Sequence, residues 1–183
     1  MSAAKSLGVF CASALPPQSC FREAVARLGT LLGENGIELV YGGGRVGLMG
    51  VLADAALAAG ARVTGVIPSA LHGREVAHTG LTRLVVVADM HERKRQIFAL
   101  SDAIAILPGG LGTLDEALEA ITLKQLAFLA TPIVLLNLAG YWDPLITLVD
   151  HVIAEGFARK EARTLFSVVA QADDIIAACI GEA

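Results

Sequence analysis

The sequence has few charged and few aromatic residues for its length. Charged residues make up 17% and aromatic residues 5% of the 183 residues, while hydrophobic residues make up 55%. This composition excludes an intrinsically disordered chain and leaves either a large buried core or a membrane protein. The formal net charge is −4 and the Lys and Arg residues form no long basic run, which argues against a nucleic-acid-binding protein.

Long uninterrupted hydrophobic runs are also missing. The longest stretch without charge, residues 125–142, is broken by Pro132, Asn137 and Gly140, whereas a membrane-spanning helix needs about 20 consecutive apolar residues. The segment after Lys5 reads as a short strand followed by two prolines and lacks the hydrophobic run of a signal peptide. We therefore predict no membrane partner and a cytoplasmic protein.

Cysteine is scarce as well. The three cysteines, Cys11, Cys20 and Cys179, form no CxxC pair. An odd number without such a pair suits a reducing compartment and gives no recognisable zinc site. The histidines at positions 72, 78, 91 and 151 show no metal-ligand spacing and read as loop or surface residues. No metal site is predicted.

The chain has the length of one ordinary domain, and we predict a single nucleotide-binding domain over residues 1–183. Runs such as AIAIL and PIVLL are apolar on both faces, as in a parallel sheet covered on both sides. They alternate with segments of helical period. We predict an α/β fold, a Rossmann-like doubly wound parallel sheet of about seven strands with helices on both faces. The predicted strands are 7–11, 38–41, 62–67, 83–88, 103–107, 133–136 and 166–170, and the predicted helices are 19–34, 48–59, 90–100, 113–128, 143–155 and 172–179.

Residues 68–80 are the least regular segment of the chain. They crowd polar and charged residues together, including His72, Arg74, Glu75 and His78. Loops at the carboxyl ends of parallel strands often carry function, so this segment is either a plain surface loop or a flap over a substrate.

Two segments place a glycine-rich turn between a predicted strand and a predicted helix. The first is YGGGRVGLMG at residues 41–50, and the second is PGGLGTLDE at residues 108–116. Glycine lets backbone amides approach a ligand, and a helix start offers unpaired N–H groups and a positive dipole end. Each turn is therefore a candidate anion site. Because both turns lie at the carboxyl edge of the predicted sheet, we expect them to face one cleft.

Three other known motifs agree less well with this sequence. Gly42, Gly44 and Gly47 have the GxGxxG spacing of dinucleotide-binding proteins, but the next predicted strand ends without the acidic residue that binds a ribose. The interpretation of the protein as a nicotinamide-dependent oxidoreductase therefore depends on the glycine spacing alone. Neither turn has the lysine and adjacent serine or threonine of a P-loop, and no GxSxG motif of serine hydrolases occurs.

The predicted helix that begins at Met90 carries an arginine among core positions. Asp89 is a good N-cap, and Glu92 gives the helix a start that resembles a capping box. Arg93 then shares a stripe with Met90 and Ile97. Its charge must either reach water or meet an anion, because burying it unpaired is very costly.

Glu116 has two interpretations. It lies three residues after Thr113, which is the TxxE spacing of a capping box. It also lies at a helix start assigned to an anion, where a carboxylate is useful if it acts on a sugar carbon that becomes positive during a reaction.

The glycine turns belong to a longer pattern. It comprises YGGGRVGLMG, MHERK at 90–94, SDAIAILPGGLGTLDE at 101–116, and GYWDPL with EGF further on. In these motifs the sequence resembles the LONELY GUY (LOG) family of cytokinin riboside 5′-monophosphate phosphoribohydrolases, sometimes labelled lysine decarboxylases. The resemblance extends from FCAS at residues 10–13 to Phe157. It implies hydrolysis of the N-glycosidic bond of an N6-modified adenosine 5′-monophosphate without a cofactor.

The resemblance also implies the site residues and the partners. Arg93 and Glu116 are expected to be the catalytic pair. The ligand is expected to be a small nucleoside monophosphate, and the protein a homodimer with its site near the subunit interface. The resemblance assigns nucleotide contacts to Glu75, Arg93, Lys94, Gly109, Gly110, Leu111, Gly112, Thr113, Leu114, Asp115 and Thr122.

Some positions depart from the family pattern. Ala12 stands where glycine is usual, and Leu111 and Leu123 stand where the family usually has aromatic residues. The identity of the base that the protein accepts therefore stays open. It also stays open whether the ligand is a hormone precursor, plain AMP or a damaged nucleotide.

Two further functions compete with this one. A non-catalytic nucleotide or cofactor carrier could use the same scaffold, but it has no need of Arg93 and Glu116 together. A pyridoxal phosphate decarboxylase needs a Schiff-base lysine, and only Lys94 of the four lysines is near the predicted site.

Overall fold

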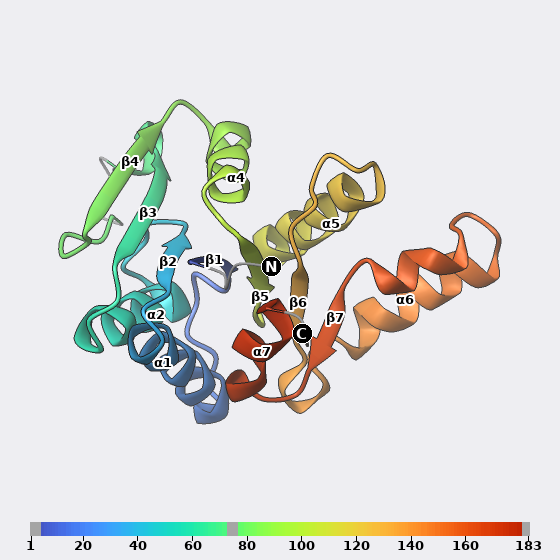
Figure 1. The fold of residues 1–183 in the computed structure, drawn as a ribbon, viewed down its shortest axis with the longest axis horizontal. Helices are drawn as coiled ribbons and strands as arrows, with labels where there is room; N and C mark the ends of the chain where they lie inside the picture. The colour runs from blue at the N-terminus through green and yellow to red at the C-terminus, as the bar shows by residue number, and fades with distance from the viewer. Residues whose placement is uncertain (1–4, 73–76, 181–183) are drawn as a thin grey trace.

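The chain folds around a seven-stranded parallel sheet. This computed structural model describes residues 5–72 and 77–180, and Figure 1 shows the sheet with its helices. The spatial order of the strands is β4-β3-β2-β1-β5-β6-β7. The strands are β1 (Ser6–Phe10), β2 (Glu38–Tyr41), β3 (Val63–Pro68), β4 (Arg83–Val87), β5 (Ala103–Ile106), β6 (Ile133–Leu136) and β7 (Ser167–Val169).

The order of the strands places a switch point at the centre of the sheet. β1 pairs with β2 on one side and with β5 on the other, so the chain winds outward in both directions from β1. In open α/β sheets, ligands bind beyond the carboxyl ends of the strands at such a point. Both glycine turns follow strands next to β1.

The helices are α1 (Ser19–Glu34), α2 (Gly47–Ala58), α3 (Ser69–His72), α4 (Met90–Ala99), α5 (Leu111–Gln125), α6 (Asp143–Ala154) and α7 (Ile175–Ile180), with short 3-10 turns η1 (Leu138–Gly140), η2 (Lys160–Thr164) and η3 (Ala172–Asp174).

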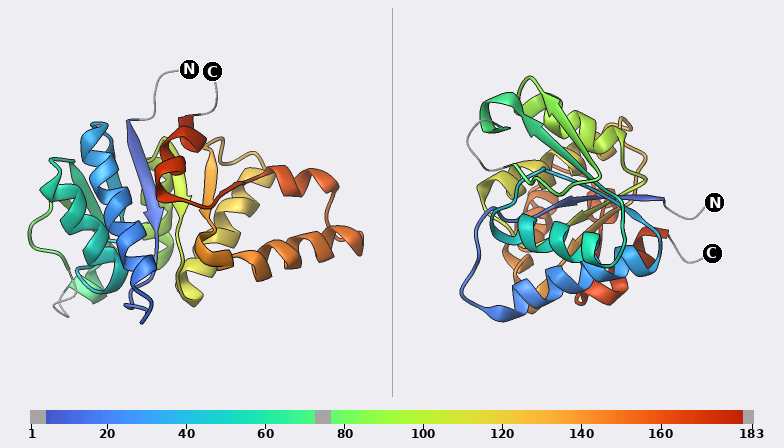
Figure 2. Two further views of the ribbon diagram at one scale, coloured as in Figure 1. Left: turned by 90° about the horizontal axis from the view of Figure 1, so that it is seen from below. Right: turned by 90° about the vertical axis from the view of Figure 1, so that its left-hand side faces the viewer.

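The sheet is covered on both faces, which confirms the predicted fold class. Every residue of β3, β5 and β6 is buried. One apolar cluster joins the sheet to α1, α2 and α7, and a second joins it to α4, α5 and the start of α6. The two layers of helices are visible in Figure 2. Burial on both sides explains why these strands read as continuous apolar runs.

The structure corrects several predicted boundaries. α5 begins at Leu111 and ends at Gln125, whereas the pattern predicted residues 113–128. The last predicted helix is divided into η3 and α7. The segment 68–80 contains the short helix α3, which the sequence did not predict. Glu75, a predicted nucleotide contact, lies outside the described residues.

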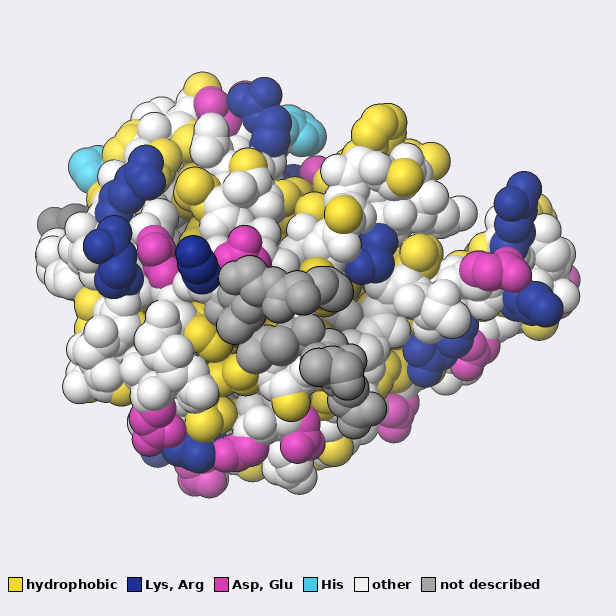
Figure 3. All heavy atoms as spheres, viewed as in Figure 1, with side chains coloured by type: hydrophobic (Ala, Val, Ile, Leu, Met, Phe, Trp, Pro, Cys, Tyr) yellow, Lys and Arg dark blue, Asp and Glu magenta, His cyan; other side chains and the backbone are white. Residues whose placement is uncertain are grey.

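α6 and η2 form an arm that stands away from the sheet (Figures 1 and 2). The sequence of α6, DPLITLVDHVIA, has the apolar period of a packed helix, yet Leu145 is its only buried residue. Hydrophobic side chains also gather over α5 and the turn that follows it, across from the arm (Figure 3). No helix in the described part of the chain has the length and hydrophobicity to cross a bilayer.

Candidate active site

Arg93 projects from the first turn of α4 into the carboxyl edge of the sheet. The predicted N-cap is confirmed, because the Asp89 side chain accepts a hydrogen bond of 2.8 Å from the Glu92 amide. This start fixes the direction of the helix. Arg93 Nε donates to the carbonyl of Val66 at 3.2 Å, and Nη2 donates to the carbonyl of Gly42 at 3.1 Å. The guanidinium is therefore held by the ends of β2 and β3 and does not extend into water.

With Arg93 in this position, only glycine fits at position 42. A Cβ placed there would overlap the guanidinium group of Arg93. The first glycine turn thus has a packing role that the sequence did not reveal, because the residue that fills the space lies 51 positions further along the chain.

Glu116 faces Arg93 from the first turns of α5. Its Oε1 lies 3.8 Å from Arg93 Nη1, and the side chains are 9% and 11% exposed, respectively. Burial raises the pKa of Glu116 to about 7, although Arg93 and Lys94 act in the opposite direction. A carboxyl group with this pKa changes charge in the range where an acid–base group is most useful.

Two further buried side chains surround the pair. Burial raises the pKa of the Cys11 thiol at the end of β1, and both Glu116 and Arg93 interact with it electrostatically. Burial likewise raises the pKa of Tyr41, whose hydroxyl donates to the carbonyl of Gly44 at 3.1 Å. Both groups are therefore neutral near pH 7 and add no charge next to the pair.

The start of α5 is open as an anion site. Its N-cap is Gly110, and no side chain caps the helix. Thr113 lies inside the first turn and is buried, so the predicted capping box between Thr113 and Glu116 is wrong. Gly109 leaves room for Thr113, since a Cβ at position 109 would overlap the threonine side chain. The first-turn amides of α5, with the positive end of its dipole, are available to a ligand.

The start of α2 is not available in the same way. The amides of Leu48 and Met49 donate to the carbonyls of Ala14 and Ala12 at 3.2 and 3.3 Å. The loop after β1 therefore occupies the position that an anion would take. We predicted two anion sites at this edge, and the structure offers one open helix start there, that of α5.

Lys94 is buried and paired with two carboxylates on α5. Its Nζ lies 2.8 Å from Asp115 Oδ2 and also forms an ion pair with Glu119, and its side chain is 7% exposed. This pairing explains how carboxylates can stand at an anion-binding helix start, because the lysine balances their charge. The spacing of residues within α4 could not reveal this group of one lysine and two carboxylates, because both carboxylates lie on another helix.

The other predicted contact residues fall into two groups. Leu111 and Gly112 are exposed at the start of α5, and Leu114 is partly buried one turn further on. Thr122 is exposed near the far end of α5, where its hydroxyl donates to the Leu118 carbonyl at 2.7 Å. Thr122 follows Glu116 by six residues and so lies on a different face of the helix. The first group lies at the start of α5, the helix that carries Glu116, and Thr122 lies near the other end of this helix.

Fold and site together define a Rossmann-like α/β protein with an uncapped helix start beside a buried arginine–glutamate pair. A sequence model described as possible lysine decarboxylase matches residues 49–179. The probable cytokinin riboside 5′-monophosphate phosphoribohydrolase LOGL1 of Oryza sativa subsp. japonica is 44% identical over 168 residues, which cover 92% of this chain and 75% of that protein. The corresponding enzyme LOG7 of Arabidopsis thaliana is 41% identical over 172 residues, covering 94% and 79%. The chain therefore belongs to the LOG family, as its motifs indicated.

A more distant likeness concerns the fold alone. The molybdenum cofactor carrier protein of Chlamydomonas reinhardtii superposes with a TM-score of 0.66 at 21% sequence identity, and the match covers 94% of each chain. The same architecture thus serves proteins with different names, and the assignment of an activity depends on the site.

Proposed function

We propose that the protein hydrolyses the N-glycosidic bond of an N6-modified adenosine 5′-monophosphate and releases the free base and ribose 5-phosphate. The observation that carries this proposal is the buried Arg93–Glu116 pair at 3.8 Å, beside the uncapped start of α5. The named relatives are phosphoribohydrolases of this class. Water is the only co-reactant of this hydrolysis, and the proposed mechanism assigns no step to an organic cofactor or a metal ion.

The 5′-phosphate binds at the start of α5. The amides of residues 110–113 point out of the first turn, and Gly110 and Gly112 have open space where a side chain would project. A dianionic phosphate there gains charge-assisted hydrogen bonds and the favourable end of the helix dipole. Binding at this point fixes the ribose next to Glu116 on the same helix.

Glu116 acts on the ribose. As the C1′–N bond breaks, its electron pair leaves with the base and positive charge develops on the sugar. The ionised carboxylate stabilises this charge and orients a water molecule toward C1′. The water adds to C1′, and one of its protons is transferred to the departing base. Because the pKa of Glu116 is raised to about 7, the carboxylate is substantially ionised at neutral pH and can still exchange a proton.

Arg93 positions Glu116. Its guanidinium is tied to two backbone carbonyls and lies next to the carboxylate, so it holds Glu116 in one orientation and lowers its pKa relative to burial alone. A non-catalytic carrier has no need of such a pair in a dry environment. A Schiff-base role for Lys94 is also disfavoured, because its ammonium group is engaged by Asp115 and Glu119.

The reaction is tested by incubating the protein with AMP and with N6-isopentenyl-AMP and separating the products by chromatography. We expect free base and ribose 5-phosphate in equal amounts. Intact nucleotides that nevertheless bind to the protein would instead support a carrier.

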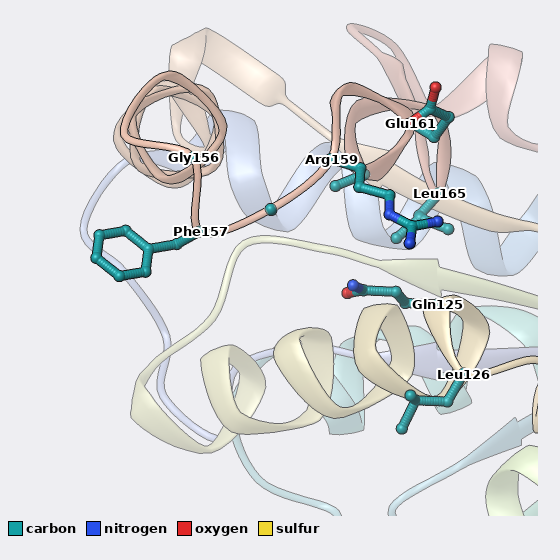
Figure 4. A pocket seen from close by; sticks show the side chains of 9 residues that line it. Gln125, Leu126, Gly156, Phe157, Arg159, Glu161 and Leu165 are labelled. Atoms are coloured by element: carbon teal, nitrogen blue, oxygen red, sulfur yellow. The ribbon is translucent and has the colours of Figure 1, made fainter.

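We also propose that the protein is a homodimer formed through the arm and α5. A groove of about 660 Å³ separates the two, lined by residues at the end of α5 and after α6. In Figure 4, Arg159 extends from the segment after α6 toward α5, where Gln125 lies, and Phe157 points away at the edge of the groove. Phe157 and Leu126 are 86% and 58% exposed. Exposed apolar surface of this kind, next to the helix α6 with its one buried residue, is typical of an interface.

A second copy suits this surface because the arm and the groove belong to the same chain. Two-fold symmetry would bury the arm of each subunit against α5 of the other. Thr122, on the exposed face of α5, would then lie at the interface, which gives its predicted contact a place near the partner. We further propose a cytoplasmic location, which rests on the unpaired cysteines.

A further inference from the structure

Tyr141 connects the loop after β6 to the glycine turn at the start of α5. Its hydroxyl donates a hydrogen bond of 2.5 Å to the carbonyl of Gly109, 32 positions away in the sequence. A tyrosine hydroxyl has one proton, and this carbonyl engages it. The contact therefore ends on the turn to which the proposed mechanism assigns the phosphate, although that mechanism gives Tyr141 no part.

The two peptide groups before the start of α5 are held by their carbonyls. The Pro108 carbonyl accepts from the Ala12 amide at 3.3 Å. The Gly109 carbonyl accepts from Tyr141. The described part of the chain contains no cis peptide bond, and in a trans peptide the C=O group and the following N–H group point in opposite directions. The bond from Tyr141 therefore also fixes the direction of the Gly110 N–H, one of the amides proposed to bind the phosphate.

Gly110 is the amide of the site that α5 itself does not orient. It is the N-cap, with φ −85° and ψ −159°, so its backbone lies outside the helix. Glycine has more accessible conformations than any other residue, and no described residue packs against the place where a side chain would project. The amides of residues 111–113, by contrast, belong to the helix and follow its axis. The direction of the Gly110 N–H thus depends on contacts from outside the helix, of which Tyr141 makes one.

Tyr141 is itself held firmly. Its ring packs edge-on against Phe21 at 5.8 Å and against Trp142 at 5.0 Å. The Trp142 amide donates to Oδ1 of Asn137 at 2.6 Å, which closes the loop after β6. Within this loop Ala139 has a φ of 52°, a conformation that costs a non-glycine residue energy and persists where surrounding contacts enforce it. The hydroxyl is thus presented to the glycine turn from a rigid support.

We propose that Tyr141 is a positioning residue for the phosphate site, which directs the Gly110 N–H toward the 5′-phosphate through the Gly109 carbonyl. This inference rests on the proposed function, because it takes the phosphate to bind at the start of α5. Tyr141 acts through the backbone and does not donate to the substrate, since its one proton is already donated to Gly109. The hydroxyl should therefore matter for ligands that carry a phosphate and not for those that lack one.

The test measures Kd for AMP and for adenosine by calorimetry, with each change made in the Glu116→Gln protein so that AMP stays intact. Tyr141→Phe removes the hydroxyl and keeps the ring. We expect it to raise Kd for AMP about tenfold, because a hydrogen bond to a charged group is among the stronger ones. Kd for adenosine, which has no phosphate, should stay within about twofold.

Ser101→Ala is the matched control. The Ser101 hydroxyl likewise donates to a backbone carbonyl, that of Ile97, at 2.6 Å. Ser101 precedes β5 and so lies at the amino edge of the sheet, opposite the site. This change should leave both Kd values within about twofold of those of the Glu116→Gln protein.

The Gly110 amide reports the cause. In protein with isotope-labelled glycine, its NMR resonance should move when AMP is added to the Glu116→Gln protein, and it should move less in the variant that also carries Tyr141→Phe. A general loss of stability does not produce this difference, because it does not change the direction of one N–H group in the folded protein.

Three results would overturn the inference. They are a Kd for AMP within about twofold after Tyr141→Phe, equal losses of affinity for AMP and adenosine, and an unchanged response of the Gly110 amide. Base release is measured in parallel in proteins that keep Glu116. Weaker AMP binding after Tyr141→Phe, without base release by wild type, would support the inference and overturn the proposed hydrolysis.

Discussion

Arg93 and Glu116 meet across the carboxyl edge of the sheet, with Nη1 of the arginine 3.8 Å from Oε1 of the glutamate. They come from different helices, and neither has enough exposed surface to be solvated by water alone. Burial favours the neutral carboxylic acid and the arginine favours the carboxylate, so the pKa of Glu116 lies at about 7. The pair is thus adjusted to change its protonation state near neutral pH.

This balance predicts a pH dependence. Since the ionised carboxylate stabilises the positive ribose, base release should rise as pH increases through about 7, where Glu116 loses its proton. Removing the nearby positive charge in Arg93→Gln should move the pKa of Glu116 upward. The side-chain carboxyl carbon of Glu116, followed by NMR in both proteins, reports this directly. An unshifted titration in Arg93→Gln would show that the arginine does not influence the carboxylate.

The contact at Gly42 predicts a loss of activity from a single methyl group. In Gly42→Ala the new Cβ would displace the Arg93 guanidinium, which should lower kcat at least about tenfold, because displacements of about 1 Å at a catalytic group are costly. A double-mutant cycle identifies the cause. Gly42→Ala should add little to Arg93→Gln if it acts through the arginine, and independent, additive losses would contradict this.

The open start of α5 predicts that removing one backbone N–H group there weakens binding of the nucleotide. Leu111 is the first helical residue and is 85% exposed, so proline is tolerated there but removes an N–H group. We expect Leu111→Pro to raise KM for the nucleotide about tenfold, because a hydrogen bond to a charged group contributes about 1.5–3 kcal/mol. Leu111→Ala keeps the amide and serves as the control. Equal KM values for the two variants would place the phosphate elsewhere.

The proposed interface at the arm predicts that a charge placed there changes the oligomeric state of the protein. Phe157→Asp puts a charge in the proposed interface and should convert the dimer into a monomer, as measured by light scattering after size-exclusion chromatography. Val86→Asp is the control, because Val86 is 50% exposed on β4, at the opposite edge of the sheet from β7 and the arm. A monomeric wild type, or a dimer that survives Phe157→Asp, would refute the proposed interface.

The sequence predicted the sheet and the two glycine turns, because each leaves a local pattern, and its motifs singled out Arg93 and Glu116, which the structure places next to each other. Apolar runs identify buried strands, and Arg93 is conspicuous among core positions of its helix. It did not predict the true start of α5. Thr113 and Glu116 have capping-box spacing, but the chain enters the helix two residues earlier, at Leu111.

The remaining differences arise from contacts between distant segments. The loop after β1 occupies the start of α2, and Lys94 pairs with carboxylates of α5. No pattern within α2 or α4 encodes these partners. The amphipathic period of α6 predicted a helix, yet it could not indicate that most of its apolar face is left uncovered by the described part of the chain.

The most direct test of the account measures both binding and base release for Glu116→Gln with N6-isopentenyl-AMP at pH 8. The phosphate site at α5 is intact in this variant, so we expect binding within about threefold of wild type and base release reduced at least about 100-fold, as for loss of a positioned acid–base group. Base release by Glu116→Gln at the rate of wild type would contradict the central claim that this buried carboxylate performs the chemistry.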